Sequence, residues 1–229
     1  MNRTVVELLA DNAEHADAFA GRFDEVQDGQ HPEAVTVCCS DSRVLQDQLF
    51  GNDTPGRLFT CSNIGNRVVQ RTDAGEVVSG DVLYPLAHTG TRTAIVVGHT
   101  GCGAVTATYG VLTGDIDADS EPPGIRHCVG LLAPHLEPGV GLLPEGLDRT
   151  EAVNRLVEYN VDRQVDHLVG SDDVPDDASV VGVVYDFQDV YGAERGEVHV
   201  INVDGERDPD ALRTEHAEVA DRIGRLWTY

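Results

Sequence analysis

The chain has 229 residues, enough for one α/β domain with a substantial core, and a second domain is not expected. Its formal net charge is −24, from 40 acidic and 16 basic residues, and every basic residue is an arginine. This balance argues against nucleic-acid binding, which needs clustered positive charge. Because unpaired carboxylates repel one another in dilute buffer and are screened in molar salt, the composition predicts a halophilic protein with an acidic surface, adapted to a salt-rich cytoplasm.

The sequence also lacks the features of a secreted or membrane protein. No stretch approaches the roughly 20 apolar residues of a membrane span, and the beginning has no apolar signal-peptide segment. The five cysteines are an odd number in a chain too long to need disulfide cross-links. Cys38, Cys61 and Cys128 are expected to be small buried residues rather than metal ligands. We therefore predict a soluble, cytoplasmic protein that contacts neither membranes nor nucleic acid.

The first half of the chain predicts a helical arm followed by strands and a helix. Residues 3–24 carry apolar and acidic positions at helical spacing, which predicts an amphipathic helix within an N-terminal arm, residues 1–28. Short β-branched runs that end in small or polar residues are typical of buried parallel strands. Such runs occur at residues 34–38, 57–61 and 94–98. Residues 75–88 predict a helix, although Pro85 is unfavourable inside one.

The second half predicts further helices and the rest of the sheet. Gly103 should open a helix whose N-terminal amide groups point towards the end of the preceding strand. Residues 114–146 are rich in Gly, Pro and Asp, so they predict a loop-rich insertion with short helical pieces, whereas residues 149–169 have one apolar face and predict a long helix. Two more strands and a C-terminal helix are expected at residues 180–185, 197–201 and 207–229. The pattern predicts a single domain over residues 1–229, with an α/β fold and a mainly parallel central β-sheet flanked by helices.

Two polar motifs directly follow predicted strands. Cys39-Ser40-Asp41-Ser42-Arg43 follows the first strand, and His99-Thr100-Gly101-Cys102-Gly103 follows the third. Open α/β sheets bind ligands at the carboxyl ends of their strands, so the two motifs should meet. Cys39, His99 and Cys102 supply one ligand fewer than a closed structural zinc site, and two cysteines with one histidine leave the fourth position for water or substrate. The motifs therefore predict a catalytic Zn²⁺ site and an enzyme.

Asp41 and Arg43 add an ionisable pair beside the predicted metal. Their spacing from Cys39 places both on the side of its thiolate in an extended turn. Asp41 could accept a hydrogen bond from a water on the metal, while a bidentate contact with Arg43 keeps its carboxylate ionised and oriented. If Arg43 released the carboxylate, Asp41 could itself reach the metal and close the open position. An ordinary surface ion pair is the alternative.

Through these residues the chain resembles the β-class carbonic anhydrases, which reversibly hydrate carbon dioxide. Cys39-Ser40-Asp41-Ser42-Arg43-Val44 and Gly98-His99-Thr100-Gly101-Cys102-Gly103 are similar to the two signatures of that family. Asn63-Ile64-Gly65-Asn66 and residues 154–168 resemble two further family segments. The resemblance extends over most of the chain, from residue 30 to about residue 203.

The resemblance implies a cofactor, a reaction and an assembly. In the family the two cysteines and the histidine bind zinc, which carries over to Cys39, His99 and Cys102. The family's Asp–Arg dyad orients or replaces the water, a role that carries over to Asp41 and Arg43. We expect attack of zinc-bound hydroxide on carbon dioxide, giving bicarbonate and a proton, in a carbonate dehydratase that forms at least a homodimer. The family builds its cleft at a subunit interface, which the N-terminal arm would cross.

Three further residues resemble the substrate pocket of a plant-like subgroup. Gln30 could donate an amide N–H to a bicarbonate oxygen, while Phe59 and Tyr84 could exclude water from the carbon dioxide pocket. Ser62 stands where the family often has arginine, and Thr36 stands where a bacterial subgroup has tryptophan. Since that arginine and tryptophan belong to an allosteric bicarbonate site, we predict that this chain has no inhibitory pocket of that kind.

Three alternatives to carbon dioxide hydration remain open from the sequence. Relatives of the expected fold hydrolyse carbonyl sulfide or carbon disulfide, so these are alternative substrates. A non-catalytic zinc protein would result if Asp41 occupied the fourth position permanently. A redox switch could use Cys38, Cys39 and Cys61. The sequence does not identify a residue that carries protons away from the site.

Overall fold

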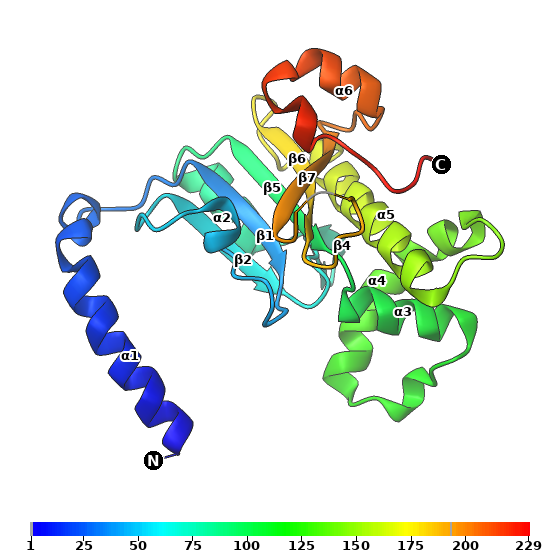
Figure 1. The fold of residues 1–229 in the computed structure, drawn as a ribbon, viewed down its shortest axis with the longest axis horizontal. Coiled ribbons are helices and arrows are strands. Elements are labelled where there is room, and N and C mark those ends of the chain that lie inside the picture. Colours follow the sequence, from blue (N-terminus) through cyan, green and yellow to red (C-terminus); the bar gives the residue numbers. More distant parts are fainter. Residues whose placement is uncertain (1, 193) are drawn as a thin grey trace.

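A mainly parallel β-sheet forms the centre of the computed structural model, which describes residues 2–192 and 194–229 (Figure 1). Within these residues five strands pair in the order β2-β1-β5-β6-β7. The strands are β1 (Ala34–Cys39), β2 (Leu58–Asn63), β5 (Thr93–His99), β6 (Ser179–Asp186) and β7 (Glu197–Val203). β2, β1, β5 and β6 are parallel, and β7 runs antiparallel to β6 at one edge. The predicted fold class is confirmed, and the predicted strands are correct to within two residues at each end.

A small hairpin lies outside this sheet and corrects one predicted helix. Strands β3 (Val69–Thr72) and β4 (Gly75–Val78) pair antiparallel, and helix α2 (Gly80–His88) follows. The predicted helix over 75–88 is therefore wrong for its first residues. Gly75 has φ of +105° at the tip of the hairpin, a backbone conformation that glycine adopts without steric cost. The β-branched pair Val77 and Val78 then continues as a strand.

Helices α3 (Gly103–Thr113), α4 (Pro123–Leu142) and α5 (Arg149–Val169) pack together, and α5 contacts β5, β6 and β7 (Figure 1). The predicted helices at 103 and 149–169 are confirmed. α5 begins with a capping box, in which the Asp148 side chain accepts from the Glu151 amide and Glu151 accepts from the Asp148 amide. Gly98 lets α5 approach the sheet closely, because a Cβ atom there would lie 2.6 Å from the side chain of Val161. The sheet and α5 thus share one apolar core.

Helix α4 overturns the predicted loop-rich insertion at 114–146. Its 20 residues form one continuous helix despite Pro134 and Pro138. Both prolines lie on the exposed side, where water can bond the carbonyl groups that lose their helical partner. The buried side carries Val129, Leu132 and Leu136, at helical spacing. The prolines concealed this periodicity because they occupy the other face of the same helix.

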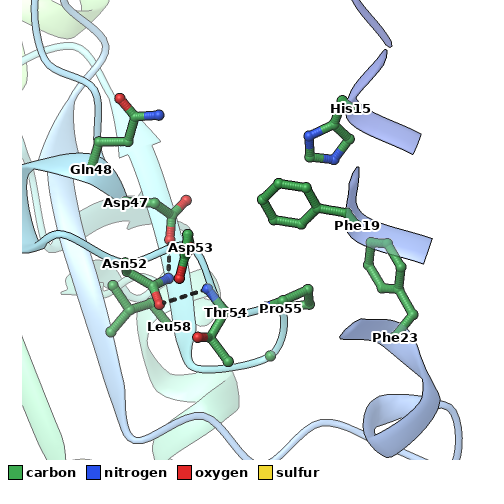
Figure 2. A pocket seen from close by; sticks show the side chains of 11 residues that line it. His15, Phe19, Phe23, Asp47, Gln48, Asn52, Asp53, Thr54, Pro55 and Leu58 are labelled. Carbon is green, nitrogen blue, oxygen red and sulfur yellow. Dashed lines mark hydrogen bonds between the residues drawn. The ribbon is translucent and has the colours of Figure 1, made fainter. Parts of the chain in front are cut away.

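The N-terminal arm is helical, as predicted, but it stands away from the sheet. Helix α1 (Arg3–Phe19) continues into a 3₁₀ helix (Ala20–Val26), and none of the described residues of α1 is buried (Figure 1). Its apolar side chains, including Leu8 and Leu9, are exposed. A cavity of about 420 Å³ lies near the base of the arm. Figure 2 shows Phe19 and Phe23 of the arm on one side of it, with Pro55 and the residues around it opposite. The arm therefore presents an apolar face that its own chain does not cover.

The predicted C-terminal helix over 207–229 is also corrected. The segment forms helix α6 (Pro209–Glu215) and a 3₁₀ helix (Ala217–Arg222), after which the chain is not helical. The last residues instead bond to carboxylates on α5. Glu158 accepts the backbone N–H groups of Leu226 and Trp227 at 2.7 and 3.1 Å, and Asp162 pairs with Arg225 at 2.6 Å. These buried contacts stabilise an extended tail over a helix.

None of the helices in the described part of the chain is both long enough and apolar enough to span a membrane.

Candidate metal centre

The predicted ligands Cys39, His99 and Cys102 come together at one edge of the sheet, and we call these three residues the metal centre. Cys39 ends β1, His99 ends the neighbouring parallel strand β5, and Cys102 is the N-cap of α3. One ligand atom from each lies within 4.8 Å of the other two. Parallel neighbouring strands end at the same edge, which explains why residues 60 positions apart in the sequence meet here. The side chains are almost completely buried, with exposures of 5%, 1% and 1%.

The spacing and protonation of these groups fit a zinc ion. The two Sγ atoms are 3.8 Å apart, which is roughly the separation of two thiolates that each lie about 2.3 Å from a tetrahedral zinc ion. The hydrogen bond shared with Cys102 lowers the pKa of Cys39 to about 5, so this pair already favours a thiolate. The same contact and burial raise the pKa of Cys102.

His99 supplies an independent indication of a metal. Its Nδ1 lies 3.0 Å from the carbonyl oxygen of Thr100, an arrangement in which Nδ1 carries the proton and donates it. Its Nε2 is buried and has no hydrogen-bond partner in the part of the chain that the structure describes. A buried nitrogen without a partner is costly unless it binds a ligand. A ring nitrogen of His99 lies within 4.8 Å of both thiol sulfurs and Nε2 is the one left without a hydrogen bond, so the three residues fit Zn²⁺ with its fourth position open.

Asp41 and Arg43 form the bidentate pair that the sequence predicts. Nε and Nη2 of Arg43 donate to Oδ1 and Oδ2 of Asp41 at 2.8 and 2.7 Å, and the Arg43 backbone N–H donates to Oδ1 at 3.0 Å. These hydrogen bonds hold the pKa of the Asp41 carboxyl well below its ordinary value. Oδ2 of Asp41 lies 3.7 Å from Nε2 of His99. The carboxylate is therefore ionised beside the metal centre and is held by arginine.

The surroundings keep Arg43 in this position. Its Nη2 also donates to the carbonyl of Gly101 at 3.2 Å, and its guanidinium lies 4.5 Å from the centre of the Phe187 ring. Gly101 has φ of +62°, and its N–H donates to Oδ1 of Asn154 on α5 at 2.8 Å. α5 thus supports the loop that carries both Cys102 and the Arg43 contact.

Asp186 is a supporting residue that the sequence does not reveal. Its buried carboxylate accepts the hydroxyl of Thr100 at 3.2 Å. It also accepts backbone N–H groups from the loop after β6, at Gln188, Asp189, Val190 and Tyr191. This carboxylate fixes the loop that places Phe187 against Arg43 and 5.7 Å from the His99 ring. No local sequence spacing signals this supporting role, because Asp186 ends β6 and reaches the metal centre only through tertiary contacts such as the one with Thr100.

A cavity of about 600 Å³ opens beside the metal centre. Cys39, Ser40 and Asp41 form its polar end. Its other lining residues are mostly small or apolar and include Ile64, Ala104, Ala107, Ile125, Cys128 and Val129. Helix α4, which the sequence did not predict, thus supplies one wall. A cavity with apolar walls and a few convergent polar groups is the usual form of a small-molecule site.

The predicted substrate residues Gln30, Phe59 and Tyr84 do not belong to this cavity, as far as the described residues show. The Phe59 and Tyr84 rings lie 6.2 Å apart, so these two residues are neighbours. Gln30 and Tyr84 are exposed to solvent. Within one chain these three residues do not meet the metal centre, and their predicted role stays a prediction.

Cys38 and Cys61 are poor candidates for the redox switch considered from the sequence. Burial raises the pKa of Cys38 to about 12 and that of Cys61 to about 11, so neither forms much reactive thiolate near neutral pH. Cys38 packs with Val97 and Val183 in a core cluster separate from the one that contains Cys39. Successive residues of a strand point to opposite faces, which separates Cys38 from the metal centre.

Comparison with known proteins relates the chain to the carbonic anhydrases. A family described as carbonic anhydrase matches residues 34–198. The carbonic anhydrase of Helicobacter pylori (strain J99) is 30% identical over 118 residues, which cover 51% of this chain and 52% of that protein. The chain spans about half the length of the curated relatives it matches.

Solved structures show the same fold. The β-carbonic anhydrase CafA of Aspergillus fumigatus superimposes with a TM-score of 0.69 at 26% identity, covering 97% of this chain and 100% of that one. A structure from a report of two tetrameric β-carbonic anhydrases of Sordaria macrospora has a TM-score of 0.68 at 24% identity, covering 88% and 98%. Because the family match includes both halves of the metal centre and most of the chain, this protein belongs to the β-carbonic anhydrase family.

Proposed function

We propose that the protein is a zinc-dependent carbonic anhydrase that reversibly hydrates carbon dioxide to bicarbonate and a proton. The observation that carries this proposal is the three-ligand metal centre beside an arginine-held Asp41, at the polar end of an apolar cavity. Zn²⁺ would be held by Sγ of Cys39, Nε2 of His99 and Sγ of Cys102, and it would supply a water acidic enough to lose a proton near neutral pH.

The chain's own groups have separate tasks in this proposal. Asp41, kept ionised by Arg43, accepts a hydrogen bond from the attacking oxygen and orients it. The apolar wall of Ala104, Ala107 and Val129 takes up carbon dioxide, which carries no net charge or dipole. Because Asp41 is paired with Arg43 in this structure, its geometry favours an open fourth position over permanent closure by Asp41.

We also propose that the protein works as a homodimer or higher oligomer and that Gln30, Phe59 and Tyr84 contribute to the cavity of a partner copy. Two observations support this: these residues lie outside their own chain's cavity, and α1 leaves its apolar side chains exposed. In this arrangement the plant-like pocket is completed across the interface. Light scattering with Leu8→Asp and Leu9→Asp replacements, which place charge on the arm, should show dissociation of the oligomer.

Stopped-flow measurement of carbon dioxide hydration tests the reaction. We expect zinc-loaded protein in molar KCl to show rapid turnover between about pH 6.5 and 9, with sensitivity to a chelator. Cys102→Ala should abolish both zinc binding and turnover, while Cys61→Ala, which removes a buried thiol outside the metal centre, should retain them. Absent turnover in folded, zinc-loaded protein would contradict the proposal, and hydrolysis of carbonyl sulfide or carbon disulfide would then identify the alternative.

The environment of the protein follows from its charge and its thiols. We propose a salt-rich cytoplasm, because the net charge is −24 and because the five cysteines, all within the described residues, are free thiols. The denaturant midpoint should rise when KCl is increased from about 0.1 M to about 2 M, since screening removes repulsion between carboxylates. A midpoint that does not change with salt would contradict the adaptation.

We propose further that bicarbonate does not inhibit the protein through the pocket of the bacterial subgroup. The position that would need arginine is Ser62, whose hydroxyl lies 2.8 Å from that of Ser40 and accepts the amide of Gln46 at 2.6 Å. A short neutral side chain with these partners cannot hold an anion as a guanidinium does. The initial hydration rate should therefore fall with bicarbonate only as product inhibition requires.

A further inference from the structure

Glu76, His135 and His167 form a second group of ligand-type side chains, which we call the His–Glu cluster. Glu76 lies on β4, His135 on α4 and His167 near the end of α5. One ligand atom from each lies within 4.8 Å of the other two. The sequence gives no sign of this group, because its members are far apart in the chain and belong to three different elements. It also lies outside the cavity beside the metal centre, as far as the described residues show.

The distances within the cluster resemble those around one ion. Nε2 of His135 and Nε2 of His167 lie 2.8 and 3.9 Å from Oε1 of Glu76. Nitrogen and oxygen ligands about 2.0–2.1 Å from a tetrahedral zinc ion lie roughly 3.3 Å apart. The two observed distances fall on either side of that value. Nε2 of His167 also shares a hydrogen bond with Nδ1 of His135 at 3.2 Å, which a bound ion would replace. Side-chain rotations that release this bond would bring the ligand atoms to equal spacing.

The contact between His135 and Glu76 is unusual for a simple ion pair. Although Nε2 of His135 is only 2.8 Å from the carboxylate, the atoms are not aligned for a hydrogen bond. Nε2 is buried and lacks a hydrogen-bond partner among the residues described. A nitrogen and an oxygen this close without a linear N–H···O bond are expected when both lone pairs point at a common third position. A bound cation would satisfy both atoms at once.

The charge and ligand types select the kind of cation. Glu76 supplies one negative charge, and Arg163 is already paired with Asp166 beside His167 at 2.7 Å. Burial lowers the pKa of His167, which favours the neutral imidazole that metals bind. Two imidazoles and one carboxylate suit Zn²⁺, Co²⁺ or Ni²⁺, whereas Mg²⁺ and Ca²⁺ prefer oxygen ligands.

We propose that Glu76, His135 and His167 bind a transition-metal dication of the Zn²⁺ type at a second site, separate from the metal centre. The ion joins the β3–β4 hairpin to helices α4 and α5. Helix α4 forms one wall of the cavity and α5 supports the Gly101 loop, so the second ion fixes the elements behind the active site without touching substrate. Its role is structural.

Cobalt titration of the metal-free full-length protein tests this site, with absorption spectra recorded at each step in molar KCl and excess Mg²⁺. The salt and Mg²⁺ suppress loose binding to the acidic surface. Two Co²⁺ ions per chain are expected. The ion at the metal centre should show thiolate-to-cobalt charge transfer, whereas the ion at the His–Glu cluster should show ligand-field bands without it. The spectra therefore separate this inference from the proposed catalytic function.

Variants identify the ligands. Glu76→Gln and His167→Asn should each weaken the binding event without charge transfer at least tenfold and leave the other event unchanged. His127→Asn, which removes an exposed histidine from α4, should affect neither. Binding of one Co²⁺ per chain by folded wild-type protein would overturn the proposal and indicate a metal-free hydrogen-bonded Glu–His–His group. A second event that Mg²⁺ displaces, or that survives both variants, would overturn it as well.

Discussion

The metal centre and the His–Glu cluster are both groups of three ligand-type residues, but the fold builds them in different ways. The metal centre consists of two thiols and an imidazole that are exposed by 5% or less, at the ends of two paired strands and the start of a helix. The side chains of the His–Glu cluster are exposed by 16–33% and lie on a hairpin and two helices. At the sheet edge the metal centre is buried, has a fixed geometry and lies beside a cavity. The His–Glu cluster lies where a hairpin and two helices meet, so an ion bound there would link these three elements.

This difference predicts that the two ions leave the protein at different rates. Dialysis against a moderate chelator should remove the ion of the His–Glu cluster first, because it has no thiolate ligand and is open to water. The metal centre should retain zinc with an affinity at least 100-fold higher, as expected for two thiolates in a buried site. Metal content and carbon dioxide hydration, measured together over time, check this. If activity were lost while the ion of the His–Glu cluster was still bound, the predicted order of release would be wrong.

Glu158 is a fully buried carboxylate outside both sites, and its pKa shows the effect of burial. Burial raises its pKa to about 7, from an ordinary value of 4.5. Between these pH values the folded state holds a proton that the unfolded state releases. The free energy of unfolding should therefore fall as pH rises through this window, by roughly 3 kcal/mol in total.

Denaturant unfolding in molar KCl at about pH 4.5 and 8 measures this contribution. Glu158→Gln should lack that part of the pH dependence, whereas the exposed Glu145→Gln should behave as the wild type. If Glu158→Gln keeps the full pH dependence, another group causes it. Glu158 also holds the backbone of Leu226, so the variant's tail should be compared by proteolysis.

Arg43→Gln tests whether the metal centre depends on its ion pair. Without the bidentate contact, Asp41 is free to turn towards the metal, and the hydration rate should fall about 10- to 100-fold while zinc is retained. Arg71→Gln, an exposed arginine on β3, is the matched control and should leave the rate unchanged. X-ray absorption at the zinc edge should show a carboxylate ligand in the first variant. An unchanged rate would reduce Asp41–Arg43 to a surface ion pair.

Salt should have a small but different effect on the metal affinity of the two sites. Increasing KCl from about 0.5 M to about 2 M should weaken cobalt binding at the His–Glu cluster a few-fold, because Glu76 is partly exposed and its charge is screened. Binding at the buried metal centre should change by less than a factor of two. Spectroscopic titration at both salt concentrations measures each event. Equal salt dependence would show that exposure does not control the difference.

Sequence-based prediction succeeded for some regions of the chain and failed for others. Cys39, His99 and Cys102 could be predicted because Cys39 and His99 stand at the ends of short apolar strands and Cys102 follows His99 by three residues, and strand periodicity is a local property. Helix α4 was missed because Pro134 and Pro138 interrupt the pattern while lying on its exposed face. The predicted C-terminal helix ended early because buried Glu158 and Asp162 bind the last residues in an extended form. In the C-terminal error, contacts from a helix elsewhere in the chain outweighed local preference.

The sequence by itself determined the fold class, the strands of the central sheet, the three residues of the metal centre and the Asp41–Arg43 pair. These features depend on residue type and spacing over a few positions, which the chain carries in any conformation. Only the tertiary structure decided that Asp186 supports the Arg43 contact, that α4 walls the cavity and that Glu76 meets two histidines. Those arrangements depend on how elements distant in sequence pack. Packing is set by the whole core, so no single segment reveals it.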